Sequence, residues 1–260
     1  MNTIAKTAKI ADGVVMGVGN VIHDHAQILE GTVLGNNNDI GSFCRVGPFV
    51  TMEDSNKLDF QVALGGDPQD LRYRGEETYL TIGSHNIFRE FVTAHRGAKE
   101  GDSTIIGDHN YFMAYTHVGH DSIIGNHCNL SNYVGLSGHT TMEDHSIFGG
   151  HSGSHQFCRL GMHSMIGGMV KVNFDVPPYV LVDGIPSRVR RVNSVGLKLS
   201  GFSDGDIKKI EKFYDILYRS NTDIEKTLEA LEAGFPDDPH ARRIVEFCKA
   251  STRGVMRFYR

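Results

Sequence analysis

A hydrophobic residue returns at almost every sixth position from Ile10 to Val172, and this period constrains the fold more than any other feature of the chain. A period of six fits neither an α-helix of 3.6 residues per turn nor the alternation of a hairpin strand. It fits a chain wound into a prism, in which each hexad forms one flat side and turns one corner. The first place of the hexads holds Ile10, Met16, Ile22, Ile28, Leu34, Ile40, Val46, Met52, Leu58, Leu64, Ile82, Phe88, Ala94, Ile106, Phe112, Val118, Ile124, Leu130, Leu136, Met142, Phe148, Ser154, Leu160, Ile166 and Val172.

Three hexads complete one coil, so equivalent residues of successive coils are expected to lie above one another. The first-place side chains would point inward and stack about 4.8 Å apart, the spacing of neighbouring strands in a sheet. Asn, Asp, Ser or His often fills the third and fourth places, where turn and left-handed backbone conformations are tolerated. The pattern predicts parallel sheets around an aliphatic core, stabilised by contacts between neighbouring coils.

Two polar segments interrupt the hexads without changing their phase, and both are predicted to be loops that protrude from a corner: residues 66–79 and residues 96–103. Long loops on a rigid scaffold commonly carry binding residues. The repeat ends at Asp175-Val176-Pro177-Pro178, because two consecutive prolines cannot continue a hydrogen-bonded ladder. We therefore expect a β-helical domain over residues 1–190 and a C-terminal helical domain over residues 191–260.

The C-terminal residues change to a helical pattern. Ser203 suits the N-cap of a first helix whose apolar residues fall on one face. Gly234-Phe235-Pro236 separates the two helices that follow. The predicted helices span residues 204–219, 222–233 and 239–250.

Charge and cysteine content narrow the classes of function. The formal charge of −5 does not suggest nucleic-acid binding. Residues 188–260 hold 15 Lys and Arg against 11 Asp and Glu, which suits either a docking surface for an acidic partner or a solvated helical surface. The four cysteines lack metal-ligand spacing, and three occupy the small-residue fifth place of their hexads, so we expect them buried and reduced.

No apolar run is long enough to cross a bilayer and no signal-peptide core is seen, which predicts a soluble cytoplasmic protein without a transmembrane segment.

Seven short motifs spread along the chain point to a family. They are Gln69-Asp70-Leu71-Arg72-Tyr73, His95-Arg96-Gly97, His117-Val118-Gly119-His120-Asp121, Gly138-His139, His155-Gln156-Phe157, Asp175-Val176-Pro177-Pro178-Tyr179-Val180 and Ser251-Thr252-Arg253-Gly254. In combination, and over essentially the whole chain, they resemble the UDP-N-acetylglucosamine acyltransferases that begin lipid A biosynthesis. The resemblance implies a mainly β fold, in which a left-handed parallel β-helix of hexapeptide repeats precedes a small C-terminal α-helical domain. It also implies a homotrimer with active sites in clefts between subunits.

The same resemblance implies a reaction. A 3-hydroxyacyl chain would pass from the phosphopantetheine of acyl carrier protein to the 3-position of a UDP-N-acetylglucosamine-type sugar, with no other cofactor and no metal. Such a transfer needs a base for the hydroxyl proton, a donor for the oxyanion and a groove for the acyl chain. His120 is the expected general base, because the histidine pKa lies near working pH. Asp121 would orient it, and the Gly138 N–H would donate to the oxyanion.

Further positions take substrate-binding roles from the resemblance. Asp70 and Arg72, with Gln69 beside them, would bind the glucosamine ring and phosphate. His117 and His139 would contact the acceptor sugar and its phosphates. His95 would lie at the pantetheine and acyl end of the site. His155 and Gln156 would line the nucleotide or acyl side. Acyl carrier protein would dock on C-terminal cations, which are Lys208, Lys209, Arg219, Arg242, Arg243, Lys249 and Arg253.

Several positions depart from the family pattern. Lys171 stands where relatives that use long chains have a small residue, and its bulk should shorten the groove to a medium chain of about 10 to 12 carbons, since each buried CH₂ is worth about 0.8 kcal/mol. Val195 and Leu199-Ser200 replace an acidic residue and a basic pair, which alters the expected nucleotide and phosphate contacts. With Tyr115-Thr116 just before His117, these changes leave a 3-amino UDP-sugar, acylated to an amide, as an alternative acceptor.

Other classes of function stay open on the sequence. The histidine content also fits a β-helical zinc enzyme of the carbonic anhydrase type, which needs three imidazoles converging between subunits. A non-catalytic β-helical scaffold is a third interpretation. A related acyltransferase of a later lipid A step would carry an additional N-terminal domain. One set of histidines repeats once per coil at the fourth place, and we expect it to stack along an exposed corner: His109, His127, His145 and His163.

Overall fold

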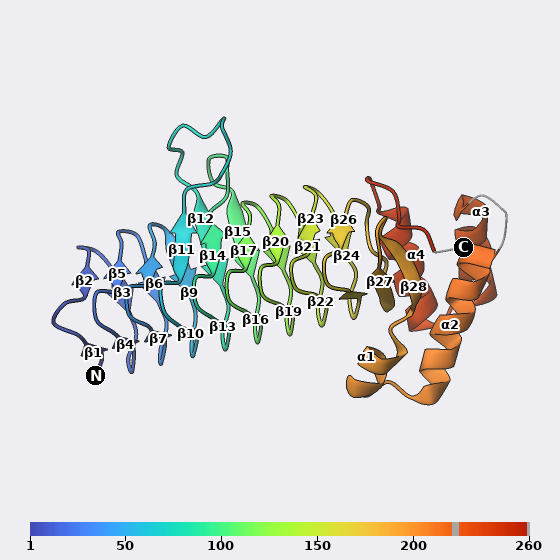
Figure 1. The fold of residues 1–260 in the computed structure, drawn as a ribbon, viewed down its shortest axis with the longest axis horizontal. Helices are drawn as coiled ribbons and strands as arrows, with labels where there is room; N and C mark the ends of the chain where they lie inside the picture. Colours follow the sequence, from blue (N-terminus) through green and yellow to red (C-terminus); the bar gives the residue numbers. More distant parts are fainter. Residues whose placement is uncertain (220–223, 259–260) are drawn as a thin grey trace.

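The computed structural model describes residues 1–219 and 224–258, which form a column of coils with helices packed against its C-terminal end (Figure 1). The coils wind as a left-handed parallel β-helix, which confirms the coiled prism predicted from the period of six and the handedness implied by the family resemblance. Successive strands of the chain belong to three different sheets, so each coil contributes one short strand to every side of the prism. No helix in the described part of the chain is long and apolar enough to cross a bilayer.

Each side of the prism is one sheet. The first sheet contains β1 (Thr3–Ile4), β4 (Val21–Ile22), β7 (Asp39–Ile40), β10 (Lys57–Leu58), β13 (Ile87–Phe88), β16 (Tyr111–Phe112), β19 (Asn129–Leu130), β22 (Ile147–Phe148), β25 (Met165–Ile166), β27 (Val180–Asp183) and β28 (Arg188–Val192). The second contains β2 (Lys9–Ile10), β5 (Gln27–Ile28), β8 (Arg45–Val46), β11 (Ala63–Gly66), β14 (Thr93–His95), β17 (His117–Val118), β20 (Gly135–Leu136), β23 (Gly153–Ser154) and β26 (Lys171–Val172). The third contains β3 (Val15–Met16), β6 (Val33–Leu34), β9 (Val50–Met52), β12 (Tyr79–Ile82), β15 (Ser103–Ile106), β18 (Ile123–Ile124), β21 (Thr141–Met142) and β24 (Arg159–Leu160).

The first-place residues fill the interior of the column. Val118 pairs in register with Leu136, and the rings of Phe88 and Phe112 stack with their centroids 4.7 Å apart. All four are fully buried, as are the fifth-place cysteines Cys44, Cys128 and Cys158. The predicted inward ladders are therefore confirmed. Removing these apolar side chains from water is the main favourable term that holds the coils together.

The corners of the prism require an unusual backbone. Twenty non-glycine residues adopt a left-handed conformation with φ between 54° and 66°, and all except Tyr179, which lies beyond the repeat, occupy the fourth place of a hexad. The third-place residues lie in the same turns but keep negative φ in the described part of the chain. A non-glycine residue in the left-handed region costs about 1 kcal/mol or more. Ring stacking between successive corners offsets part of that cost, as in the column of His85, His109, His127, His145 and His163, whose neighbouring centroids lie 4.6 to 4.9 Å apart.

The histidine column is not exposed throughout, which corrects the sequence-based expectation. His109, His127 and His145 are exposed, but His163 is only 7% exposed because the C-terminal helices cover it. Its ring lies edge-on to Phe202, with centroids 5.0 Å apart, and stacks on His145. Burial lowers the pKa of His163 to about 4.

Two loops leave the column on the same side (Figure 1). The longer one, here called the arm, comprises residues 67–78 between β11 and β12. The second loop comprises residues 96–102 between β14 and β15. Each is slightly shorter than the sequence predicted, because the flanking strands extend further. The Glu77 N–H donates to the Glu100 carboxylate over 3.1 Å, and the Gly101 N–H donates to the Glu77 carbonyl over 3.0 Å, so the loops lie side by side.

The C-terminal helices are α1 (Ser194–Leu199), α2 (Asp204–Arg219), α3 (Ile224–Gly234) and α4 (Pro239–Lys249). The prediction for α2 is confirmed, and Ser203 Oγ caps it by accepting from the Asp206 N–H over 3.1 Å. The predicted start of the next helix, at residue 222, lies outside the described residues. Helix α1, capped by Asn193, was not predicted. The boundary expected after residue 190 falls within β28 and stays a prediction.

Replacing His163 should reduce the acid sensitivity of the fold. In the unfolded chain a histidine takes up a proton below about pH 6.5, whereas folded His163 stays neutral until about pH 4. Stability is therefore lost as the pH falls through this window. We predict that His163→Phe, which preserves ring stacking, removes about 2 kcal/mol of the loss between pH 6.5 and pH 4.

The measurement is the free energy of unfolding by urea at several pH values. His109→Phe, at an exposed position of the same column, is the matched control. Identical pH dependence of His163→Phe and the unmodified protein would contradict the assignment.

Candidate active site

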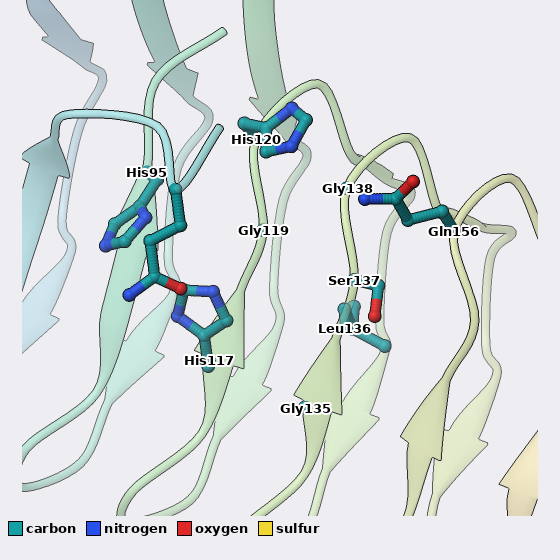
Figure 2. A pocket seen from close by; sticks show the side chains of 10 residues that line it. His95, His117, Gly119, His120, Gly135, Leu136, Ser137, Gly138 and Gln156 are labelled. Carbon is teal, nitrogen blue, oxygen red and sulfur yellow. The ribbon is translucent and has the colours of Figure 1, made fainter. Parts of the chain in front are cut away.

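A cavity of about 230 Å³ lies on the outer face of the second sheet (Figure 2). Its walls come from four successive levels of the column, those of β14, β17, β20 and β23, and from the arm. The lining residues are Gln69, His95, His117, Gly119, His120, Gly135, Leu136, Ser137, Gly138 and Gln156. Residues separated by a full coil in the sequence thus face one space.

His120 occupies the bend that follows β17, with its ring outside the column and beside the cavity (Figure 2). The residue is only 5% exposed, but it is covered by the surrounding bends and not by the hydrophobic interior. Its Nδ1 lies 2.6 Å from Asp121 Oδ2. Because an ionised carboxylate can only accept, Nδ1 carries the proton, and Nε2 is left as a free acceptor.

Asp121 is held on three sides. Its backbone, with φ of 58°, lies at a left-handed corner, and its N–H donates to Thr104 Oγ1 over 2.8 Å. The Ala98 N–H of the second loop donates to Oδ1 over 3.3 Å. Oδ2, which accepts from His120, also lies 3.6 Å from His139 Nε2. The carboxylate is therefore fixed against the imidazole before any substrate arrives.

Gly138 brings the next coil close to the free side of this imidazole. A Cβ at position 138 would lie 2.5 Å from His120 Nε2, so only glycine allows this approach. In the part of the chain that the structure describes, no acceptor takes the Gly138 N–H. An imidazole acceptor and an unpaired backbone donor thus border the same cavity.

His95 and His117 form the opposite side of the cavity, with ring centroids 4.8 Å apart. Thr93 Oγ1 lies 2.8 Å from His117 Nδ1, a contact that nothing in the sequence indicated. Burial, helped by the proximity of His95 and His120, lowers the pKa of His117 to about 4. Burial also lowers the pKa of His95. Both rings are therefore neutral at pH 7 and can exchange hydrogen bonds with a ligand.

Only one of the three binding residues predicted on the arm lines this cavity. Gln69 lines the cavity, whereas Asp70 and Arg72 do not. Those two side chains pair with each other over 2.7 Å, and Arg72 is 82% exposed. Hydrogen bonding from Arg72 holds the pKa of the Asp70 carboxyl well below its usual range. Asp70 and Arg72 thus form a charged pair on the arm that lines no wall of this cavity.

A second cavity, of about 350 Å³, continues along the same face and is called the groove here. It is lined by Ser137, His151, Gly153, Ser154, His155, Met169, Val170 and Lys171. Gly135 pairs in register with Gly153, and Gly153 with exposed Lys171. Since neither glycine carries a side chain, the outer face is bare between His117 and Lys171. The structure therefore places His155 in the groove, while Gln156 lines the first cavity.

One group of potential metal ligands occurs in the described residues, and it belongs to this site. His120, Asp121 and His139 offer ligand atoms that all lie within 4.8 Å of one another. This chain therefore contributes two imidazoles and one carboxylate, one imidazole fewer than the carbonic anhydrase interpretation needs. The hydrogen bond from His120 to Asp121 explains the arrangement without an ion.

The C-terminal surface is less available to an acidic partner than its composition suggested. Arg243 pairs with Glu143, Lys249 with Glu232 over 2.6 Å, and Lys209 with Asp238 over 3.6 Å. Lys208 is exposed, and the side chain of Arg219 lies outside the described residues. Helix α1 exposes two apolar side chains at positions that depart from the family pattern, Val195 (66% exposed) and Leu199 (84% exposed).

Two family models match the chain. The model described as Udp N-acetylglucosamine O-acyltransferase, Domain 2, matches residues 175–256, and the bacterial transferase hexapeptide model (six repeats) matches residues 103–138. Among curated proteins, the acyl-[acyl-carrier-protein]–UDP-N-acetylglucosamine O-acyltransferase of Ectopseudomonas mendocina (strain ymp) is 40% identical over 196 residues. The match covers 75% of this chain and 76% of that relative.

Solved structures of two bacterial proteins resemble the whole chain. The UDP-N-acetylglucosamine acyltransferase of Bacteroides fragilis superposes with a TM-score of 0.93 at 32% identity, over 98% of this chain and 100% of that one. The UDP-N-acetylglucosamine acyltransferase of Francisella novicida superposes with a TM-score of 0.89 at 33% identity, over 98% of this chain and 92% of that one. The similarity therefore extends through the loops and the C-terminal helices.

The depressed pKa of His117 can be measured directly. We predict that the ring of His117 titrates with a midpoint of about 4 in a nuclear magnetic resonance titration of the histidine ring protons. It would thus remain neutral through the physiological range. His117→Gln identifies the resonance, and exposed His109 serves as the internal reference. A midpoint near the unperturbed value of about 6.5 would contradict the burial that the structure assigns to this ring.

Proposed function

The chain belongs to the UDP-N-acetylglucosamine acyltransferase family, and from this premise we propose how its own residues perform the transfer. The proposed reaction moves a 3-hydroxyacyl group from the phosphopantetheine thioester of acyl carrier protein to the 3-hydroxyl of a UDP-N-acetylglucosamine-type sugar. As the family resemblance implies, it would supply the first step of lipid A biosynthesis. The observation that supports this most strongly is that His120 Nε2 and the unpaired Gly138 N–H lie close together beside one cavity.

The proposed mechanism needs no covalent enzyme intermediate. His120 Nε2 takes the proton from the sugar hydroxyl while the hydroxyl oxygen bonds to the thioester carbonyl carbon. The carbonyl electron pair moves onto oxygen, and the Gly138 N–H donates to that oxyanion. The intermediate then expels the phosphopantetheine sulfur, which recovers the proton from the His120 imidazolium. Proton and electron pairs balance within the two substrates and one imidazole.

Asp121 supports the base in two ways. Its hydrogen bond to Nδ1 keeps Nε2 as the acceptor, and its negative charge stabilises the imidazolium that forms during the reaction. The Ala98 N–H restrains the carboxylate by donating to Oδ1, and Thr104 Oγ1 holds the backbone by accepting from the Asp121 N–H. His139, whose Nε2 lies 3.6 Å from the same oxygen, is proposed to contact the acceptor beside the dyad.

The other residues that match the family motifs are proposed to bind the substrates around the His120–Asp121 dyad. Gln69, His95, His117 and Gln156 line the cavity and are proposed to bind the acceptor and the pantetheine end of the donor. Neutral His95 and His117 suit hydroxyl and amide groups. The paired side chains Asp70 and Arg72 are proposed to close over the sugar and its phosphate, which requires the arm to be held in place.

The groove supplies the proposed site for the acyl chain. It runs along the face made bare by Gly135 and Gly153, and His155 lies in it. Lys171 is in register with Gly153 and fills the next level, so its side chain would limit chain length. A homotrimer, in which the neighbouring copy covers this open face, is part of the proposal, as is docking of acyl carrier protein to the basic C-terminal surface.

The acceptor atom is the most direct test of the function. Purified protein should be incubated with a 3-hydroxyacyl carrier and either the 3-hydroxy or the matched 3-amino UDP-sugar, and the product identified by mass spectrometry. We predict ester formation at the 3-hydroxyl. Exclusive formation of the amide would replace the proposed acceptor by the 3-amino sugar. Absence of transfer to either sugar, or one zinc per chain with hydration of carbon dioxide to bicarbonate, would contradict the acyltransferase assignment.

Removing the base should abolish most of the activity without unfolding the protein. His120→Ala is expected to lower kcat by about 10² to 10⁴, the usual contribution of a positioned base. Asp121→Asn keeps the shape but weakens the orienting hydrogen bond, and should cost about 10- to 100-fold. His109→Ala, at an exposed corner, is the matched control. Full activity of His120→Ala in the presence of an intact fold would exclude His120 as the base.

Shortening the side chain at position 171 should lengthen the preferred acyl chain. Lys171→Gly extends the bare face by one level of about 4.8 Å, so the optimum should move by at least about two carbons. Competition among acyl carriers of graded length measures the shift. Lys9→Gly, at the equivalent outward place of β2, is the control. An unchanged optimum in Lys171→Gly would place the end of the groove elsewhere.

A further inference from the structure

Arg96 is a charged residue in an unusual position. It is the first residue of the second loop, yet its side chain is only 3% exposed. Burying a guanidinium group is costly unless it is paired and hydrogen-bonded. The groups that pair with the Arg96 guanidinium therefore indicate the role of this residue.

Among the described residues, all the polar partners of the Arg96 side chain belong to the arm. Its Nη2 contacts the Asp67 carboxylate and lies 3.3 Å from Tyr73 Oη, and its Nη1 lies 3.5 Å from the Thr78 carbonyl. These partners stand at the start, the middle and the end of the arm. The guanidinium also lies 5.5 Å from the ring centroid of Phe49, on the column below. One side chain thus ties three points of the arm to the column.

Near its end the arm is also anchored by Glu77, whose N–H donates to Glu100 and whose carbonyl accepts from the Gly101 N–H, but the middle of the arm has few other anchors among the described residues. Tyr73 Oη donates to the Glu76 carbonyl over 2.9 Å, and Arg74 Nη1 donates to the Leu71 carbonyl over 2.7 Å, but both bonds are internal to the arm. Leu71, at its tip, is 97% exposed. The position of the middle of the arm therefore depends on the contact between Arg96 and Tyr73.

The second loop also reaches the catalytic dyad. Two residues after Arg96, the Ala98 N–H donates to Asp121 Oδ1 over 3.3 Å. The Arg96 N–H donates to the Gly66 carbonyl over 3.0 Å, and the Gly97 N–H to the Tyr79 carbonyl over 3.1 Å, at the two ends of the arm. A segment of three residues is thus bonded to both flanks of the arm and to the carboxylate that orients His120.

We propose that Arg96 is a positioning residue that holds the arm over the site cavity in fixed register with the His120–Asp121 dyad. The inference rests on the proposed function. Arg96 does not line the cavity; it acts through Gln69, Asp70 and Arg72, which the arm carries. Without it, an acceptor sugar would meet an arm that must be ordered on binding, and that ordering would weaken binding of the acceptor.

The shape of the guanidinium explains why lysine is a poor substitute. Its planar fork points two nitrogens at different acceptors while its central carbon lies over the Phe49 ring, 5.5 Å from the centroid. A lysine ammonium can keep the ion pair with Asp67 but cannot reach Tyr73 and Thr78 in the same geometry. Arg96→Lys should therefore lie between the unmodified protein and Arg96→Gln in every assay, which a graded series tests.

The first experiment measures the arm without using activity. Trypsin cleaves after Arg72 and Arg74 when the arm opens, and mass spectrometry identifies the fragments. We expect Arg96→Gln to be cut in the arm about tenfold faster or more, since a lost hydrogen bond to a charged group is worth about 1.5 to 3 kcal/mol, a factor of 10 or more. Lys99→Gln, which removes an exposed cation from the same loop, should be cut at the unmodified rate.

The second experiment separates binding from chemistry. Arg96→Gln should raise KM for the UDP-sugar about tenfold or more and change KM for the acyl carrier by less than about twofold. Tyr73→Phe, which removes one partner and leaves the ion pair, should raise the acceptor KM by a smaller factor. A double-mutant cycle between Arg96→Gln and Tyr73→Phe should be non-additive, because the two residues share one contact.

The outcomes distinguish this inference from the function on which it rests. If the unmodified protein transfers the acyl group and Arg96→Gln keeps both the acceptor KM and slow cleavage of the arm, Arg96 is not a positioning residue, although the enzyme assignment stands. If the unmodified protein fails to acylate the sugar, the proposed function fails, while the cleavage rates still decide whether Arg96 anchors the arm. If Arg96→Gln does not fold, Asp67→Asn and Tyr73→Phe carry the same test, because each removes one partner and leaves Arg96 in place.

Discussion

Parallel hydrogen bonding between successive coils, each made of three hexads, is the constraint on which this structure depends. It fixes the level and the facing direction of every residue, because a shift of one residue would turn the aliphatic ladder outward. The functional groups inherit the same register. His120 and Gly138 are one coil apart, as are His117 and Gly135, Gly135 and Gly153, and Gly153 and Lys171. The distance between the base and its neighbouring backbone donor is therefore set by the stacking of the column.

The left-handed corners of the column bring catalytic side chains together. Successive side chains of an extended strand point to opposite faces, so neighbours in sequence do not normally touch. Asp121 follows His120 at a left-handed corner with φ of 58°, and this turn brings its carboxylate back to Nδ1. The strained conformation that every coil needs for its corner is used here to build a hydrogen-bonded dyad. The loops add what the column cannot supply, a cover over its outer face and a second bond to the carboxylate.

The sequence predicted those features that depend on local pattern. The hexads, the inward ladders, the buried fifth-place cysteines and helix α2 follow from periodicity and capping, and each is confirmed. The contact between His120 and Asp121 was hypothesised and is present. The sequence could not predict the burial of His163. Phe202, which covers this ring, lies far along the chain, and no sequence pattern links the two residues. For the same reason Thr93 and Arg96 received no role, since their partners lie on other coils or on the arm.

Determining the structure of the protein with a UDP-sugar acceptor bound is the most direct measurement of how the register of the column serves the reaction. We predict that the atom to be acylated lies about 2.6 to 3.2 Å from His120 Nε2, the range for proton transfer. In a complex that also contains the acyl donor, its carbonyl oxygen should accept from the Gly138 N–H. An acceptor bound on another face of the column, or one whose reacting atom is well beyond hydrogen-bond reach of Nε2, would contradict the role assigned to His120.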